Sequence, residues 1–229
     1  MKFSLFICYF FFSLMFLSDK NKRNYDDGSF VYNFYIVENN DKVKLKKDVR
    51  FYWYNHSVIK SSVYGIGGKV LNGEYTKTSI DSGNLIEKGN FFHGEKQGEW
   101  VKWFKGGDLN EIQYWKDGRK EGDYKLYDKN SNLKIKGRYK KGYKNGKWEE
   151  NFNNNKIISI WFKNVLNGRY EEYKKNVLIK KGKYTKGLKH GIWIDFEKKT
   201  RKKYKQGKLI DENAKPFLER IFQEEKDSI

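Results

Sequence analysis

The 229-residue sequence contains only one cysteine, one proline and three histidines. Because the single cysteine is Cys8, the rest of the chain can form neither an internal disulfide bond nor a cysteine-ligated metal site. Alanine, the strongest helix former, also occurs once, at Ala214, which disfavours helices over most of the chain. No phosphate loop or nucleophile signature is present, and no pair of carboxylates stands out as an acid–base couple. We therefore expect a non-enzymatic protein without a cofactor or a metal site.

A glycine followed two residues later by a tyrosine or a tryptophan recurs six times in the sequence. The intervals between these marker glycines are 22 to 25 residues, and the pairs are Gly73/Tyr75, Gly98/Trp100, Gly122/Tyr124, Gly146/Trp148, Gly168/Tyr170 and Gly191/Trp193. A constant period of this length is typical of repeat proteins, in which each unit buries its apolar surface against its neighbours.

Each period contains the same two kinds of turn. A second glycine often precedes the marker glycine by four residues (Gly94, Gly118, Gly142, Gly187), and a polar Asn/Gly turn follows the aromatic residues. Two strands of about five or six residues and two turns of about four residues fill such a period. The pattern predicts an all-β protein, an elongated single-layer antiparallel sheet of consecutive β-hairpin repeats.

The segments from Gly137 to Trp148 and from Gly182 to Trp193 share the pattern Gly-x-Tyr-x-x-Gly-x-x-x-Gly-x-Trp. This pattern resembles the MORN-repeat variant, and the resemblance covers about residues 64–210. It implies an elongated single-layer sheet of consecutive hairpins. Proteins with this repeat are often described as bacterial repeat proteins, some of them labelled antitoxins. The segment 162–168 departs from the pattern, because it lacks one residue and one glycine.

The chain divides into four segments. Residues 1–18 have a basic start and an apolar run, which predicts a signal peptide or an N-terminal membrane anchor and thus an exported protein (periplasmic, secreted or membrane-anchored). Residues 25–64 predict one or two degenerate hairpins that form an N-terminal cap, and residues 65–210 are the repeats. In 211–229, apolar residues after Pro216 have i,i+4 spacing, which predicts a short helix capping the open sheet edge.

The formal net charge is +19, and lysines accumulate in the later repeats. The chain has 41 lysines but seven arginines, a poor balance for bidentate phosphate or base recognition, so nucleic acid is a disfavoured partner. Three interpretations of the charge remain. Lysine clusters can bind an anionic membrane surface or an acidic protein, or the charge merely keeps a thin sheet soluble.

We interpret the chain as a non-enzymatic repeat protein that presents an extended aromatic and lysine-rich sheet to a protein partner. The alternatives are an antitoxin or immunity-like inhibitor of a partner protein and a scaffold on anionic membranes. For each ring, the sequence leaves two interpretations, packing within the sheet or contact with a partner. The candidate contact residues are Trp100, Trp103, Tyr124, Tyr127, Trp148, Tyr170, Tyr173, Trp193, Phe196, Lys180, Lys181 and Lys183.

Overall fold

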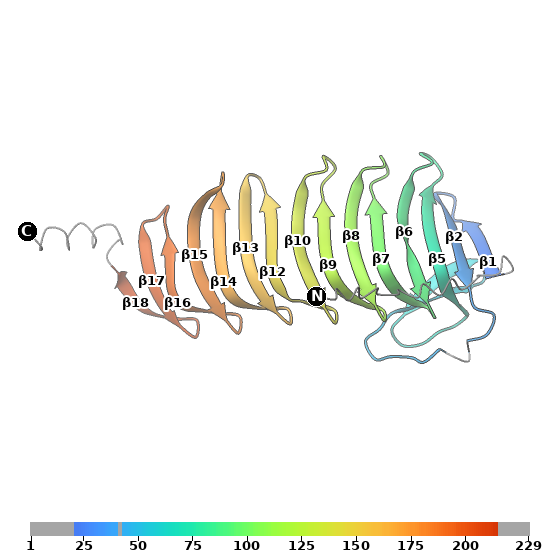
Figure 1. Cartoon of the computed structure of the whole chain (residues 1–229), viewed down its shortest axis with the longest axis horizontal. Coiled ribbons are helices and arrows are strands. Elements are labelled where there is room, and N and C mark those ends of the chain that lie inside the picture. Colours follow the sequence, from blue (N-terminus) through green and yellow to red (C-terminus); the bar gives the residue numbers. More distant parts are fainter. Residues whose placement is uncertain (1–20, 41–42, 215–229) are drawn as a thin grey trace, which may run out of the picture.

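The computed structural model describes residues 21–40 and 43–214, and these form an open sheet of eighteen strands (Figure 1). The prediction of an all-β fold is confirmed. The predicted signal or anchor and the predicted C-terminal helix lie outside the described residues. The strands are β1 (Lys22–Asp26), β2 (Phe30–Ile36), β3 (Phe51–Asn55), β4 (Val58–Ser62), β5 (Lys69–Ser79), β6 (Leu85–Phe92), β7 (Glu95–Trp103), β8 (Leu109–Lys116), β9 (Arg119–Tyr127), β10 (Leu133–Lys140), β11 (Tyr143–Lys144), β12 (Gly146–Phe152), β13 (Asn155–Phe162), β14 (Val165–Lys174), β15 (Val177–Thr185), β16 (Leu188–Asp195), β17 (Thr200–Lys205) and β18 (Lys208–Ala214).

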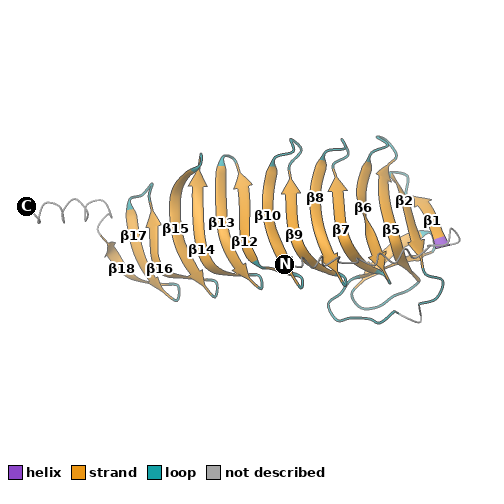
Figure 2. Ribbon diagram, in the orientation of Figure 1, coloured by secondary structure: helices purple, strands orange, loops and turns teal. Residues whose placement is uncertain are grey.

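From β5 to β18 the strands lie side by side in chain order as antiparallel hairpins (Figure 2). The hairpin β1–β2 extends the sheet by pairing with β5, and the last strand, β18, pairs with β17. The strand β18 continues to Ala214, beyond residue 210, where the sequence pattern of the repeats is predicted to end.

The rings that follow the marker glycines form one row across the sheet, on a side that we call the aromatic face. Along this row each ring is followed by a small or neutral residue on the next strand, in the order Tyr75, Gly89, Trp100, Gln113, Tyr124, Gly137, Trp148, Ser159, Tyr170, Gly182 and Trp193. Each tryptophan lies directly over a glycine, so that a Cβ atom added at Gly89, Gly137 or Gly182 would lie closer than 3.0 Å to the indole. The small residues therefore make room for the rings.

The rings of this face pack in clusters of three. Within a cluster the ring centroids are 4.9 to 5.8 Å apart, and the clusters are Tyr75–Phe91–Trp100, Tyr124–Tyr139–Trp148 and Tyr170–Tyr184–Trp193. Each cluster combines a repeat whose marker glycine is followed by tyrosine with the next repeat, whose marker glycine is followed by tryptophan. The structural period is therefore two sequence repeats. Edge-to-face aromatic pairs add about 0.5–1.5 kcal/mol each beyond the burial of their area.

A second layer covers the N-terminal end of the aromatic face. The hairpin β3–β4 pairs with the start of β5, and its rings pack onto the main sheet, with Tyr52 5.0 Å from Phe91 and Tyr54 5.2 Å from Phe34. The predicted cap at 25–64 therefore has two parts, because β1–β2 extends the sheet while β3–β4 lies over it. The second layer does not reach β10 to β18, and no segment within residues 21–40 and 43–214 covers those strands (Figure 1).

Hydrogen bonds join the turn of one repeat to the repeat before it. The residue before a marker glycine accepts a hydrogen bond from a backbone N–H in the next Gly-x-x-x-Gly turn. The pairs are Asn72 with His93 (3.0 Å), Gln97 with Asp117 (2.9 Å), Glu121 with Lys141 (2.7 Å) and Asn167 with Lys186 (3.2 Å). The glycine that follows each donor bonds a backbone carbonyl of the preceding repeat. These bonds fix the stacking of the hairpins.

Replacing Asn167 by alanine removes one of these acceptors. We expect a loss of about 1 kcal/mol in the free energy of unfolding, since a net intramolecular hydrogen bond contributes about that much. The measurement is denaturant unfolding, and Asn167→Asp is the matched control because it keeps an acceptor oxygen at the same place. Equal losses in the two variants would show that the hydrogen bond to Lys186 is not the source of the effect.

Candidate partner-binding site

The aromatic face buries most of the rings that the sequence marks as candidate contacts. Trp100, Tyr124, Trp148 and Trp193 have only 2, 9, 1 and 6 % of their surface exposed. Tyr170 is half-buried in the third cluster. These five rings contact one another or their flanking side chains, so their faces are already occupied within the sheet.

The second ring of each repeat is more accessible. Trp103, Tyr127 and Tyr173 are half-buried, and Phe196 is 42 % exposed. The Tyr173 hydroxyl donates a hydrogen bond to Glu171 (2.9 Å). Both side chains lie on the side of the sheet opposite the aromatic face. We call this side the outer face. Phe196 belongs to it too, because the Lys181 ammonium lies 5.7 Å from the centroid of its ring.

The three candidate lysines of β15 lie on two different faces. Lys180 is on the aromatic face, where its ammonium lies 3.1 Å from Glu172 and 3.9 Å from Asp195. The hydrogen bond to Glu172 raises the pKa of Lys180, and nearby carboxylates add to the effect. Lys181 and Lys183 are exposed on the outer face. The structure therefore brings two of these lysines together and separates the third.

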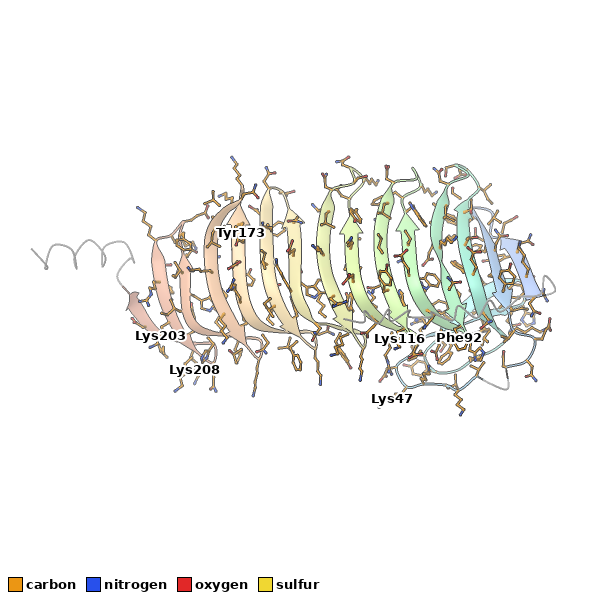
Figure 3. All side chains as sticks on the ribbon, viewed as in Figure 1. Lys47, Phe92, Lys116, Tyr173, Lys203 and Lys208 are labelled. Atoms are coloured by element: carbon orange, nitrogen blue, oxygen red, sulfur yellow. The ribbon has the colours of Figure 1, made fainter. Side chains whose placement is uncertain are left out.

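Cationic and apolar side chains gather on the outer face of β14–β17. Arg169 is opposite Lys183 on the neighbouring strand, and Ile192 is opposite Lys203, which Figure 3 labels on β17. Ile192 is 41 % exposed, and Arg169 has 74 % of its side chain exposed. We name this surface the outer basic patch and define it as Arg169, Lys181, Lys183, Ile192, Phe196 and Lys203. Glu171, 3.7 Å from Arg169, offsets part of its charge.

The pair of Arg169 and Lys183 departs from the charge arrangement in most of the sheet. Elsewhere strands place opposite charges across from one another, as in Glu87–Lys102–Glu111, Asp123–Arg138 and Glu172–Lys180–Asp195. Arg169 opposite Lys183 is a like-charge pair, which destabilises a sheet. Lys125 is also opposite a lysine, Lys136, but Lys136 has Glu149 on its other side. Two further like-charge pairs, Lys116 with Arg119 and Lys205 with Lys208, flank hairpin turns. Within the outer basic patch, Lys181 is opposite Glu171 and Lys203 is opposite Asp211, so the repulsion lies between Arg169 and Lys183, where an anionic partner would relieve it.

A row of lysines on the aromatic face was missed by the sequence reasoning. Each is the middle residue of a Gly-x-x-x-Gly turn, and its ammonium lies over a ring, with Lys96 3.5 Å from Trp100, Lys120 4.8 Å from Tyr139, Lys144 4.2 Å from Trp148 and Lys189 4.6 Å from Trp193. Burial lowers the pKa of Lys96 and of Lys120, and Glu87 partly offsets the effect at Lys96. The repeated Gly-x-Lys-x-Gly spacing in the sequence could have identified these lysines.

Residues 21–40 and 43–214 contain no group of three or more His, Cys, Asp and Glu side chains that could hold a metal ion. The same residues form no helix that is long and apolar enough to cross a membrane.

Comparison with known proteins finds no match to any protein-family model or to any curated protein sequence. The class of the protein is therefore defined by its own structure, as an elongated sheet of β-hairpin repeats.

Proposed function

We propose that this chain is a non-enzymatic repeat protein that binds an acidic protein partner through the outer basic patch. The observation that carries the proposal is the like-charge pair of Arg169 and Lys183 beside the exposed side chains of Ile192 and Phe196. An acidic partner would neutralise the cations, and its apolar side chains would cover the two exposed ones. Opposite surface charges also speed association.

The distribution of lysines favours a discrete protein partner over a membrane surface. Between Lys174 and Lys208 the sequence has 14 Lys and Arg residues but only two Asp and Glu residues. These cations are divided between the faces, with Lys180 and Lys202 on the aromatic face and Lys181 and Lys203 on the outer face. A flat membrane can contact only one face of a flat sheet, so it would leave many of these cations unused.

The resemblance to the MORN-repeat variant is compatible with this proposal. We propose membership of that family on the strength of the Gly-x-x-x-Gly-x-Trp pattern. An antitoxin-like role would be one form of partner binding, in which the bound partner is inhibited.

The double variant Lys181→Glu/Lys183→Glu tests the proposal. We expect it to recover specific partners at least tenfold less well than the unchanged chain in affinity purification with mass spectrometry. The fold should be retained, because the attraction gained between a carboxylate at position 183 and Arg169 offsets the repulsion that a carboxylate at position 181 adds opposite Glu171. Lys60→Glu/Lys129→Glu is the matched control, since both lysines are exposed and the change in net charge is the same.

Equal recovery of the same partners by the two double variants would contradict the proposal. Co-sedimentation with vesicles that contain an anionic lipid, at moderate salt, provides a separate measurement. If the unchanged chain bound these vesicles and recovered no specific protein, the membrane scaffold would replace the proposed function.

A further inference from the structure

The row of small residues on the aromatic face is interrupted at Lys202. On the strand after Trp100 the row has Gln113, and on the strand after Trp148 it has Ser159. On the strand after Trp193, the equivalent residue is Lys202. This change places a third cation beside Lys180 and Lys189 at the C-terminal end of the aromatic face.

These lysines surround a hollow of about 250 Å³ on β15–β17. Trp193 and Tyr204 form part of its wall, and its polar lining includes Lys180, Lys189, Thr200 and Lys202. The hollow is on the face opposite the outer basic patch, because Lys202 pairs with Trp193 while Lys203 pairs with Ile192.

The charges in this hollow are less balanced than in the earlier repeats. Two of the three equivalent lysines there form an ion pair, with Lys96 3.0 Å from Glu87 and Lys144 3.5 Å from Glu150. Lys189 instead lies over two rings, 4.6 Å from Trp193 and 5.2 Å from Tyr204.

The nearest acid of the hollow is already engaged. Asp195 lies 3.9 Å from Lys180 and accepts a hydrogen bond from the backbone N–H of Lys198 (2.9 Å). Within the described residues, the ion pairs of this region join Lys180 to Glu172 and to Asp195, and none involves Lys189 or Lys202.

We propose that this hollow binds a tetrahedral oxyanion, a phosphate or sulfate group that is either free or the ester group of a larger molecule. The ammonium groups of Lys189 and Lys202 supply the charge, and the Thr200 hydroxyl supplies a neutral donor. A hollow of this size holds several waters, each of which takes about 30 Å³ in the liquid, so an oxyanion with part of an attached group fits.

The test is calorimetric titration of the full chain with inorganic phosphate, inorganic sulfate and glycerol phosphate at constant ionic strength in chloride. We expect saturable binding of at least one of these probes. The variant Lys202→Ser should bind at least tenfold more weakly, and its fold should persist because Ser159 occupies the equivalent place two repeats earlier. Tighter binding of glycerol phosphate than of phosphate would identify the ester as the natural form.

Lys203→Ser is the matched control, since it removes the same charge from the next residue of the same strand on the opposite face. It should leave the affinity unchanged. Lys189→Met, which keeps an unbranched stem over Trp193, should weaken binding as Lys202→Ser does. Equal weakening by Lys202→Ser and Lys203→Ser, or no binding beyond that of chloride, would overturn the proposal. The protein partner is proposed to contact Lys203 and not Lys202. Absence of oxyanion binding would therefore not contradict the proposed protein binding, and absence of protein binding would not contradict the proposed oxyanion site.

Discussion

Replacing Gly137 by alanine is expected to lower the free energy of unfolding by about 3 kcal/mol. The added methyl group would lie closer than 3.0 Å to the Trp148 indole, which is 1 % exposed. The indole cannot move away easily, because Tyr139 is 5.1 Å from it on one side and Tyr124 is 5.8 Å from it on another. Overpacking of a close-packed site typically costs about 1–3 kcal/mol, and this site is at the upper end because backbone lies beneath the ring.

Denaturant unfolding of Gly137→Ala measures this effect. Gly65→Ala is the control, because a Cβ atom there would meet no atom within 4 Å. The double variant Gly137→Ala/Trp148→Leu should be more stable than the sum of the two single losses implies, because a smaller side chain makes room for the methyl group. Wild-type stability of Gly137→Ala would mean that the indole does not lie over Gly137 in solution.

Alkaline pH is expected to unfold the protein, because its ring clusters contain buried tyrosines. Burial raises the pKa of Tyr124 to about 12, and Glu111 adds to the effect. Burial also raises the pKa of Tyr75 and Tyr170, and to a lesser degree those of Tyr139 and Tyr184.

The sign of the effect follows from the two states. The stabilisation is complete below pH 10, where tyrosines in both states hold their protons. As the pH rises from 10 through about 12, the unfolded chain releases protons that folded Tyr124 retains, so stability falls. Two pKa units correspond to about 3 kcal/mol for this residue alone. The lowered pKa values of Lys96 and Lys120 act in the opposite direction below the ordinary lysine value of 10.5, but five tyrosines of the ring clusters have raised pKa values.

Denaturant unfolding at a series of pH values between 9 and 12, with tyrosinate absorbance recorded in parallel, measures this prediction. Tyr124→Phe is the control, since it keeps the ring and removes one titrating hydroxyl. It should lose less stability than the unchanged chain over the same pH range. Titration of all tyrosines near pH 10 without unfolding would contradict the burial of the ring clusters.

The sequence alone determined the fold class and the position of the repeats. The marker glycines and the Gly-x-x-x-Gly turns act within a few residues, because a tight turn requires particular backbone angles wherever it occurs. Gly94, Gly118, Gly142 and Gly187 all have positive φ, as the turn interpretation requires. The positions of such turns can therefore be predicted from the sequence without knowing which strands are neighbours.

The tertiary structure alone decided which side chains share a face. Register shifts between strands, such as those between Lys181 and Lys183 or between Ser159 and Trp161, break the simple alternation on which a sequence-based assignment depends. The packing of each tyrosine-marked repeat against a tryptophan-marked one and the second layer from β3–β4 both depend on contacts across strands. Hairpin turns are set by their own residues, whereas a surface is set by the neighbours that the whole sheet brings beside it.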